Sequence, residues 1–157
     1  MLYVDSCALI KHYIRERGSH ALKAKLKEES LHQTGVFMSA VGYAEVLAVF
    51  ARRLRDHLLS GKRSQALQKR FLNDWMFSLS HVQLSAGVLG LIPELVNRHP
   101  LRGSDAIHLA SALWLRDALG IGKHLGPPNQ SLTFATSDRP LKNAASMEGL
   151  QVFDPGN

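Results

Sequence analysis

The sequence predicts an α/β protein in which a parallel β-sheet is covered by helices on both faces. Two observations lead to this fold class. Short apolar runs rich in strand-forming residues alternate along the chain with longer stretches of helical periodicity. No tight hairpin turn joins any two of the short runs, so successive strands are expected to be parallel, with helices as their connections.

The first half of the chain predicts two strands and four helices. A short apolar run ends at Asp5, and a helical pattern follows with Ser6 as its candidate N-cap. Gly18-Ser19 breaks this helix, and the next one has a lysine-rich, solvated face. Ser39 is expected to cap a long helix, which Ser60-Gly61 separates from a further amphipathic one. The expected elements are strand 2–5, helix 6–16, a helix from 19 to about 29, strand 36–38, and helices 40–58 and 62–79.

The second half predicts three strands and three helices. Pro100 ends one helix, and Ser104 is expected to cap a strongly apolar one. The segment 120–129, with its glycines and two prolines, is expected to hold no regular structure. The expected elements are strand 82–84, helices 85–98 and 105–118, strand 132–135, helix 139–147 and strand 151–153.

The composition is that of one folded domain spanning residues 1–157, without repeats or linkers. The net charge of +6 favours an anionic partner such as nucleic acid or an acidic protein, although solubility alone is an alternative explanation. No run of 18 apolar residues is present, so no membrane span is expected, and no signal-peptide pattern precedes the first strand. A single cysteine, Cys7, excludes an intrachain disulfide and favours a cytoplasmic location.

Glu45 stands out because it is the only charged residue between Ala40 and Ala51. A helix that is apolar on nearly every side is expected to be buried. A buried carboxylate is costly unless it is paired or binds a metal. Glu45 is therefore expected to have either a metal ion or an arginine as its partner.

Three further acids lie in similarly apolar surroundings. Asp105 opens an apolar helix, where stabilisation of the helix dipole is an alternative role. Asp5 and Asp138 each follow a strand and precede a helix, so each alone is also explained as an N-cap. In a parallel sheet, however, strand ends near 5 and 136 lie on one edge, where the helices beginning near 40 and 105 also start.

Carboxylates that converge at one edge repel one another, and a hard divalent cation, Mg²⁺ or Mn²⁺, relieves the repulsion. Asp5, Asp105 and Asp138 are the expected metal ligands, with Glu45 as a further ligand or a base. Two hydroxyl residues lie next to these acids in sequence, and they are expected to hydrogen-bond to them or, alternatively, to serve only as caps. These residues are Ser6 and Thr136.

Sequence motifs around the four acids carry a family resemblance over nearly the whole chain. They are Tyr3-Val4-Asp5-Ser6-Cys7-Ala8-Leu9-Ile10-Lys11, Glu16 with Gly18-Ser19, Ser39-Ala40-Val41 through Ala44-Glu45-Val46, Leu101-Arg102-Gly103-Ser104-Asp105-Ala106-Ile107-His108-Leu109-Ala110, and Ala135-Thr136-Ser137-Asp138 with Gly149-Leu150-Gln151-Val152. With these motifs in this order, the sequence resembles the PIN-domain family, specifically the VapC-type toxins of bacterial and archaeal toxin–antitoxin pairs.

The resemblance implies a three-layer α/β/α sandwich with a five-stranded parallel sheet. It implies a Mg²⁺- or Mn²⁺-dependent endoribonuclease whose catalytic residues are Asp5, Glu45, Asp105 and Asp138. It also implies a homodimer that is neutralised by a small VapB-like antitoxin, whose tail enters the active-site groove. Two departures are Cys7, where the family usually has serine or another small residue, and a longer segment at 120–131.

Several other residues have two explanations each. Arg102 and Arg139 adjoin two of the acids and are expected to bind RNA phosphates, whereas the basic residues on the helices expected at 40–58 and 62–79 are more simply a solvated surface. His108 is expected to pack or to bond within its helix rather than to join the site. An apolar stripe is expected to be core or, alternatively, a groove for an antitoxin or a second subunit. The stripe consists of Leu67, Phe71, Trp75, Met76 and Phe77.

Two other functions are compatible with an acid-edged α/β fold. A receiver-like phosphoacceptor domain needs an acidic pair after the first strand, and the Ser6-Cys7 pair that follows Asp5 disfavours it. A non-catalytic PIN-like module that binds RNA or protein has no need of four intact acids. The sequence therefore predicts a metal-dependent nuclease acting on RNA.

Overall fold

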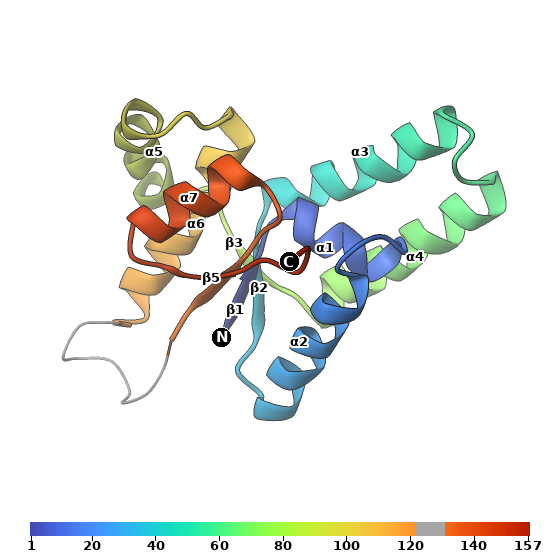
Figure 1. Ribbon diagram of the computed structural model, residues 1–157, viewed down its shortest axis with the longest axis horizontal. Coiled ribbons are helices and arrows are strands. Elements are labelled where there is room, and N and C mark those ends of the chain that lie inside the picture. Colours follow the sequence, from blue (N-terminus) through green and yellow to red (C-terminus); the bar gives the residue numbers. More distant parts are fainter. Residues whose placement is uncertain (122–130) are drawn as a thin grey trace.

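The computed structural model describes residues 1–121 and 131–157, which form a parallel sheet of five strands with helices on both faces (Figure 1). This confirms the predicted fold class. The strands are β1 (Leu2–Val4), β2 (Val36–Ser39), β3 (Ser80–Val82), β4 (Thr133–Ala135) and β5 (Gln151–Phe153). The helices are α1 (Ser6–Tyr13), α2 (Ser19–His32), α3 (Val41–Arg55), α4 (Gly61–Phe77), α5 (Ala86–Arg98), α6 (Gly103–Ala118) and α7 (Arg139–Met147).

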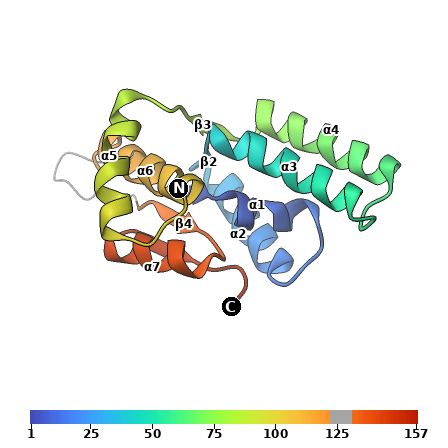
Figure 2. The ribbon, with the colours of Figure 1, turned by 90° about the horizontal axis from the view of Figure 1, so that it is seen from above.

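The sheet separates two hydrophobic cores, and the central strand β1 contributes to both. Tyr3 faces the core that includes residues of α5, α6 and α7, whereas Leu2 and Val4 face the core that includes α1, α3 and α4. This alternation follows from the two-residue period of a strand. All three residues of β1 are fully buried, as expected for a parallel strand covered on both faces. Figure 2 shows the two groups of helices on opposite sides of the sheet.

The strand order is β3-β2-β1-β4-β5, so the chain builds outward from β1 in one direction and then returns to the other side of β1. The order reverses between β1 and β4, which pair in parallel with Val4 opposite Ala135. In open α/β sheets, ligands bind beyond the carboxyl ends of the strands at such a reversal. The residues that follow β1 and β4 therefore occupy the position where the fold favours a site.

Three of the predicted helix caps are wrong. Asp5, not Ser6, is the N-cap of α1, and its side chain accepts a hydrogen bond from the backbone of Ala8. Ser39 belongs to β2, and α3 begins without a side-chain cap. Ser104 lies inside α6, which starts one residue earlier, at Gly103. Asp5 and Ser6 are adjacent residues that both favour the N-cap, whereas α3 and α6 have Ala40 and Arg102 at this position and no side-chain cap.

Several element boundaries also differ from the prediction. Helix α1 ends at Tyr13 rather than 16, because the chain turns there and the Ser19 hydroxyl donates to the Ile14 carbonyl. Helix α3 ends at Arg55 rather than 58, and β3 lies two residues earlier than predicted. Most of the segment expected to be irregular, from residue 122 onward, lies outside the described residues. None of the described helices has the length and apolarity needed to cross a lipid bilayer.

The apolar stripe of α4 is divided between the interior and the surface. Phe71 is fully buried, and Leu67 and Trp75 pack against the same core. Met76 and Phe77 are exposed by 68% and 81%. The interpretation as core therefore holds for the first three residues and is wrong for the last two.

Gly18, in the loop between α1 and α2, is expected to tolerate no side chain. Its φ is +89°, and a Cβ atom there would lie 2.3 Å from the backbone oxygen of Pro155. We expect Gly18→Ala to lower the free energy of unfolding by about 1–3 kcal/mol. The matched control is Gly61→Ala in the first turn of α4, where nothing lies within 4 Å, and it should be neutral or slightly stabilising. Urea unfolding of both variants provides the measurement, and equal effects would contradict the expectation.

Candidate metal-binding site at the edge of the sheet

Asp5 lies at the carboxyl end of β1, where hydrogen bonds hold its backbone N–H and both of its carboxylate oxygens. Its backbone N–H donates to the Ala135 carbonyl at 3.1 Å, which continues the pairing of β1 with β4. Its Oδ1 accepts from the backbone N–H of Ala8, and its Oδ2 accepts from the Thr136 hydroxyl, each at 2.6 Å. The side chain is nearly inaccessible, with the residue only 2% exposed. Asp5 is thus both the cap of α1 and a buried carboxylate at the strand reversal.

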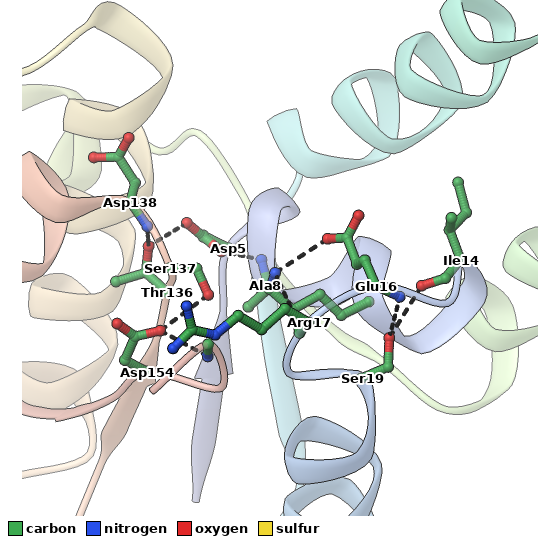
Figure 3. A network of polar contacts seen from close by, with 12 residues as sticks. Asp5, Ala8, Ile14, Glu16, Arg17, Ser19, Thr136, Ser137, Asp138 and Asp154 are labelled. Atoms are coloured by element: carbon green, nitrogen blue, oxygen red, sulfur yellow. Dashed lines mark hydrogen bonds and ion pairs between the residues drawn. The ribbon is translucent and has the colours of Figure 1, made fainter. Parts of the chain in front are cut away.

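Thr136 links Asp5 to Asp138, as Figure 3 shows. Its hydroxyl donates to Asp5 and accepts from the backbone N–H of Asp138 at 3.0 Å. Asp138 is also the N-cap of α7, since its Oδ1 accepts from the Leu141 N–H at 2.9 Å. One hydroxyl therefore sets the positions of two acids that are 133 residues apart in the chain. The predicted hydrogen bond from Thr136 to an acid is present.

Glu45 projects from α3 toward α6, and its partner is a histidine rather than an arginine. Its Oε2 lies 2.8 Å from Nε2 of His108, and its side chain is 25% exposed. Burial alone would raise the pKa of Glu45, but His108, with nearby Ser6 and Ser104, outweighs it and lowers the pKa. The prediction that α3 is buried on nearly every side is wrong, because Ala44 and Ala48 face solvent.

Asp105 lies in the first turn of α6, within electrostatic reach of the other acids. Burial raises its pKa, and the charge of Asp138 and then, more weakly, that of Glu45 raise it further. Cys7, at the start of α1, responds to all four acids together. Burial and then the charges of Asp5, Asp138, Asp105 and Glu45 raise the pKa of its thiol to about 12. The structure therefore brings the four predicted acids together around the first turn of α1.

No lysine or arginine among the described residues forms an ion pair with any of the four acids. Among the four acids, the pKa of Asp5 is raised the most. Burial raises it to about 6, although His108, Thr136 and Ala8 act in the opposite direction. A cluster of acids that no lysine or arginine of residues 1–121 and 131–157 neutralises through an ion pair favours binding of a cation.

The arrangement fits a hydrated hard cation better than a fully protein-coordinated one. In residues 1–121 and 131–157, no three His, Cys, Asp or Glu side chains are close enough to form a complete set of metal ligands. Carboxylate oxygens suit Mg²⁺ or Mn²⁺, and Mg²⁺ usually keeps several waters and binds only one or two carboxylates directly. Asp5, which is buried with a raised pKa, and Asp105, whose pKa is raised by burial and by Asp138, are the carboxylates available for such a site.

A groove of about 310 Å³ opens beside the acids. Ser6, Cys7 and Asp138 line one part of it, and Lys11, Arg52 and Arg53 line another. The groove therefore combines carboxylates with cationic side chains. A larger cavity of about 470 Å³ lies elsewhere, between α1, α2 and the end of α4, and none of the four acids lines it.

Two predicted residues lie beside the acids, and the histidine that was expected to pack is buried and also contacts Glu45. Arg102 and Arg139 are exposed next to the first turns of α6 and α7, in the vicinity of the acids, and their role in RNA binding stays a prediction. His108 is 1% exposed and bonds to Glu45, whereas the sequence favoured a packing role. Its spacing of three residues from Asp105 was the available signal, because residues i and i+3 share one helix face.

Comparison with known proteins assigns the chain to a family. The family model of the PIN domain matches residues 2–119. The chain belongs to the PIN-domain family. Within it, this PIN domain is of the VapC type. It is 31% identical over 152 residues to Ribonuclease VapC45 and Ribonuclease VapC49 of Mycobacterium tuberculosis, covering 97% of this chain and 94% of each relative. It is 29% identical to Ribonuclease VapC47 of the same species, with 99% and 98% covered.

Solved structures share the fold of this PIN domain at lower identity. FitAcB from Neisseria gonorrhoeae superposes with a TM-score of 0.65 at 20% identity, over 99% of this chain and 98% of that chain. VapBC2 from Rickettsia felis, solved with a DNA fragment from its promoter, gives a TM-score of 0.66 at 13% identity and 98% coverage of both chains. The predicted three-layer α/β/α sandwich is thereby confirmed.

Proposed function

We propose that this protein is a metal-dependent endoribonuclease and the toxin of a type II toxin–antitoxin pair. The observation that carries the proposal is the gathering of Asp5, Glu45, Asp105 and Asp138 at the strand reversal, with no lysine or arginine paired to them in the described part of the chain. The relatives in M. tuberculosis are named ribonucleases, which supports RNA as the substrate.

The cation would lie among Asp5, Asp105 and Asp138, held directly by one or two of them and through water by the others, with Glu45 as a further ligand or as the base. When bound, Mg²⁺ or Mn²⁺ would stabilise charge on the phosphate oxygens and lower the pKa of a coordinated water. Thr136 and the Ala8 N–H fix the direction of the Asp5 carboxylate before any ligand arrives. This preorganisation avoids the cost of ordering the site during the reaction.

Water is the proposed nucleophile. Because this water would be activated by the cation, no covalent intermediate with a protein nucleophile is needed. Lys11 and Arg53 in the adjoining groove are ion-paired with Glu16, whereas the exposed Arg52 would provide positive charge for the RNA backbone. Arg102 and Arg139 would do the same beside Asp105 and Asp138.

The proposed partner is a small VapB-like antitoxin. A homodimer and a cytoplasmic location are proposed from the family resemblance. The solved VapBC2 assembly of R. felis supports an antitoxin partner for a protein of this fold. Co-expression of this chain with the small reading frame adjacent to its gene, followed by purification, tests both the partner and the oligomeric state. A chain that remains alone and monomeric would contradict both.

Incubation of the purified protein with RNA in Mg²⁺ or Mn²⁺ tests the proposed activity. We expect internal cleavage of RNA and no cleavage of a DNA oligonucleotide of the same sequence. Mapping of the cleaved ends from cells that express the protein, with Asp105→Asn as the control, would identify the target. Unchanged cleavage by Asp105→Asn would assign the activity to a contaminant, and calorimetry without divalent binding would favour a non-catalytic binding module.

Thr136 offers a test of how the acids are positioned. Thr136→Val keeps the shape but removes the hydroxyl that joins Asp5 and Asp138, and we expect the cleavage rate to fall by about 10–100-fold. Thr136→Ser keeps the hydroxyl and should retain most of the activity. Single-turnover cleavage rates of both variants provide the measurement. Equal rates would show that the hydroxyl does not position the acids.

A further inference from the structure

A chain of buried polar groups lies behind the acids and connects three elements. The Tyr3 hydroxyl of β1 lies 3.0 Å from Nδ1 of His108 on α6, and Nε2 of His108 lies 2.8 Å from Oε2 of Glu45 on α3. Tyr3 is fully buried, and the His108 side chain is 2% exposed. Of these three hydrogen-bonded residues, Glu45 is therefore the only one that solvent reaches to a substantial extent, with its side chain 25% exposed.

The Tyr3 ring has little freedom to move. It stacks on Phe134 at 5.2 Å between centroids with an interplanar angle of 8°, and it meets the His108 ring edge-on at 6.0 Å. A tyrosine hydroxyl ordinarily keeps its proton at neutral pH. Tyr3 can therefore donate a hydrogen bond from a fixed position.

The order of donors along the chain follows from the capacity of each group. An ionised carboxylate only accepts, so the hydrogen between His108 and Glu45 must be on Nε2. In a neutral imidazole, Nδ1 then carries a lone pair and accepts from the Tyr3 hydroxyl.

We propose that Tyr3 and His108 act as positioning residues, which hold the imidazole as the Nε2–H tautomer and thereby orient Glu45 toward the cation site. The inference rests on the proposed function, because it concerns the cation of that site. With Oε2 bound to His108, Oε1 is the oxygen that remains for the cation. A histidine held in this way acts as a second layer behind a ligand, which fixes the direction of the ligand's carboxylate.

The arrangement compensates for a weakness in the placement of Glu45. Glu45 has several rotatable bonds and projects from a helix whose neighbouring Ala44 and Ala48 face solvent. Asp5, in contrast, is fixed by Ala8 and Thr136. Without His108, Glu45 would have to be ordered when the cation binds, which costs conformational entropy. The buried histidine provides that order in advance.

A purely structural role for His108, as a link between α3 and α6, predicts effects on stability alone. The first test is therefore ¹⁵N NMR of the histidine rings in metal-free protein at pH 8, where an ordinary histidine is neutral. We expect the His108 signals of an Nε2–H tautomer in the wild type. In Tyr3→Phe we expect a larger fraction of His108 to be the Nδ1–H tautomer. An Nδ1–H tautomer in the wild type would overturn the proposal.

The second test is Mn²⁺ affinity, measured by calorimetry. His108→Leu removes the donor to Glu45 and should weaken Mn²⁺ binding by about 10–100-fold. His108→Gln is the matched control, because the amide nitrogen of glutamine can take the place of Nε2, and it should retain most of the affinity. Equal affinities of the two variants, with both folded by circular dichroism, would contradict a positioning role.

The third test asks whether His108 acts through Glu45. In a Glu45→Gln background, His108→Leu should cause little further loss of Mn²⁺ affinity, because the two changes remove one shared interaction. Additive losses would overturn the proposal. The inference and the proposed function can fail separately. Wild-type protein that binds Mn²⁺ as described but leaves RNA intact would refute only the nuclease, whereas RNA cleavage with equal Mn²⁺ affinity in all His108 variants would refute only the inference.

Discussion

Asp5→Asn is expected to abolish RNA cleavage and, at the same time, to stabilise the metal-free protein. The two effects have one cause, which is a carboxylate buried close to other acids. Asparagine keeps an oxygen that can accept from the Ala8 N–H, so the cap of α1 is preserved. It cannot supply the negative charge that a divalent cation needs, so the loss of cleavage should exceed about 100-fold.

The sign of the stability effect follows from the pKa of Asp5. Burial raises it from 3.8 to about 6 in the folded protein. A raised folded pKa means that the protonated form favours folding, so this contribution is present below about pH 4 and is lost as the pH rises through 6. At pH 7.5 the ionised carboxylate therefore costs on the order of 2–3 kcal/mol at most, and Asp5→Asn should recover part of it.

Urea unfolding in EDTA at pH 7.5 and pH 4 provides the measurement. The variant should be more stable than the wild type at pH 7.5, and the difference should shrink at pH 4, where Asp5 itself is largely protonated. Asp56→Asn, at the exposed end of α3, serves as the control. It should have the stability of the wild type at both pH values and should cleave RNA at the same rate. A variant that is less stable than the wild type at pH 7.5, or one that still cleaves RNA, would contradict the assignment of Asp5.

Divalent cations are expected to stabilise the wild type and to be required for cleavage. A cation at the edge of the sheet offsets the repulsion that raises the pKa of Asp105. A ligand at 100 times its dissociation constant adds about 2.7 kcal/mol to the free energy of unfolding. We therefore expect Mg²⁺ or Mn²⁺ to raise the unfolding midpoint, and EDTA to eliminate cleavage.

The specificity of this stabilisation distinguishes binding at the site from general screening of charge. Potassium chloride at the same ionic strength is the first control, because it screens surface charges without binding carboxylates as a divalent ion does. Asp5→Asn is the second, and its unfolding midpoint should respond only weakly to Mg²⁺. Equal stabilisation of the wild type and this variant would place the bound cation elsewhere on the protein.

Much of the candidate site was predictable because acids in apolar surroundings are rare. Asp5 and Asp138 follow strands that apolar composition identifies, and in a parallel sheet such positions share an edge. The competing explanation of each as a helix cap is also correct, since both accept from a backbone N–H in the first turn of a helix. The two roles are not exclusive, because a carboxylate has two oxygens and the cap occupies only one.

The errors in the prediction concern which neighbours a residue meets. Glu45 was expected to lie on a buried helix, since alanine and valine count as apolar wherever they lie, but Ala44 and Ala48 face solvent. His108 was expected to pack or to bond within its own helix, because nothing in the sequence places it opposite Glu45, 63 residues away. Local patterns describe one element, whereas these contacts join two.

By itself, the sequence determined the class of the fold, the positions of the strands to within two residues, and the set of acids at the strand and helix ends. Those features depend on the period of apolar residues and on local propensities. Only the tertiary structure decided that β4 returns to pair with β1, which places Thr136 between Asp5 and Asp138. Strand order results from contacts between distant parts of the chain, and this order brings Asp5 and Asp138 to the same place.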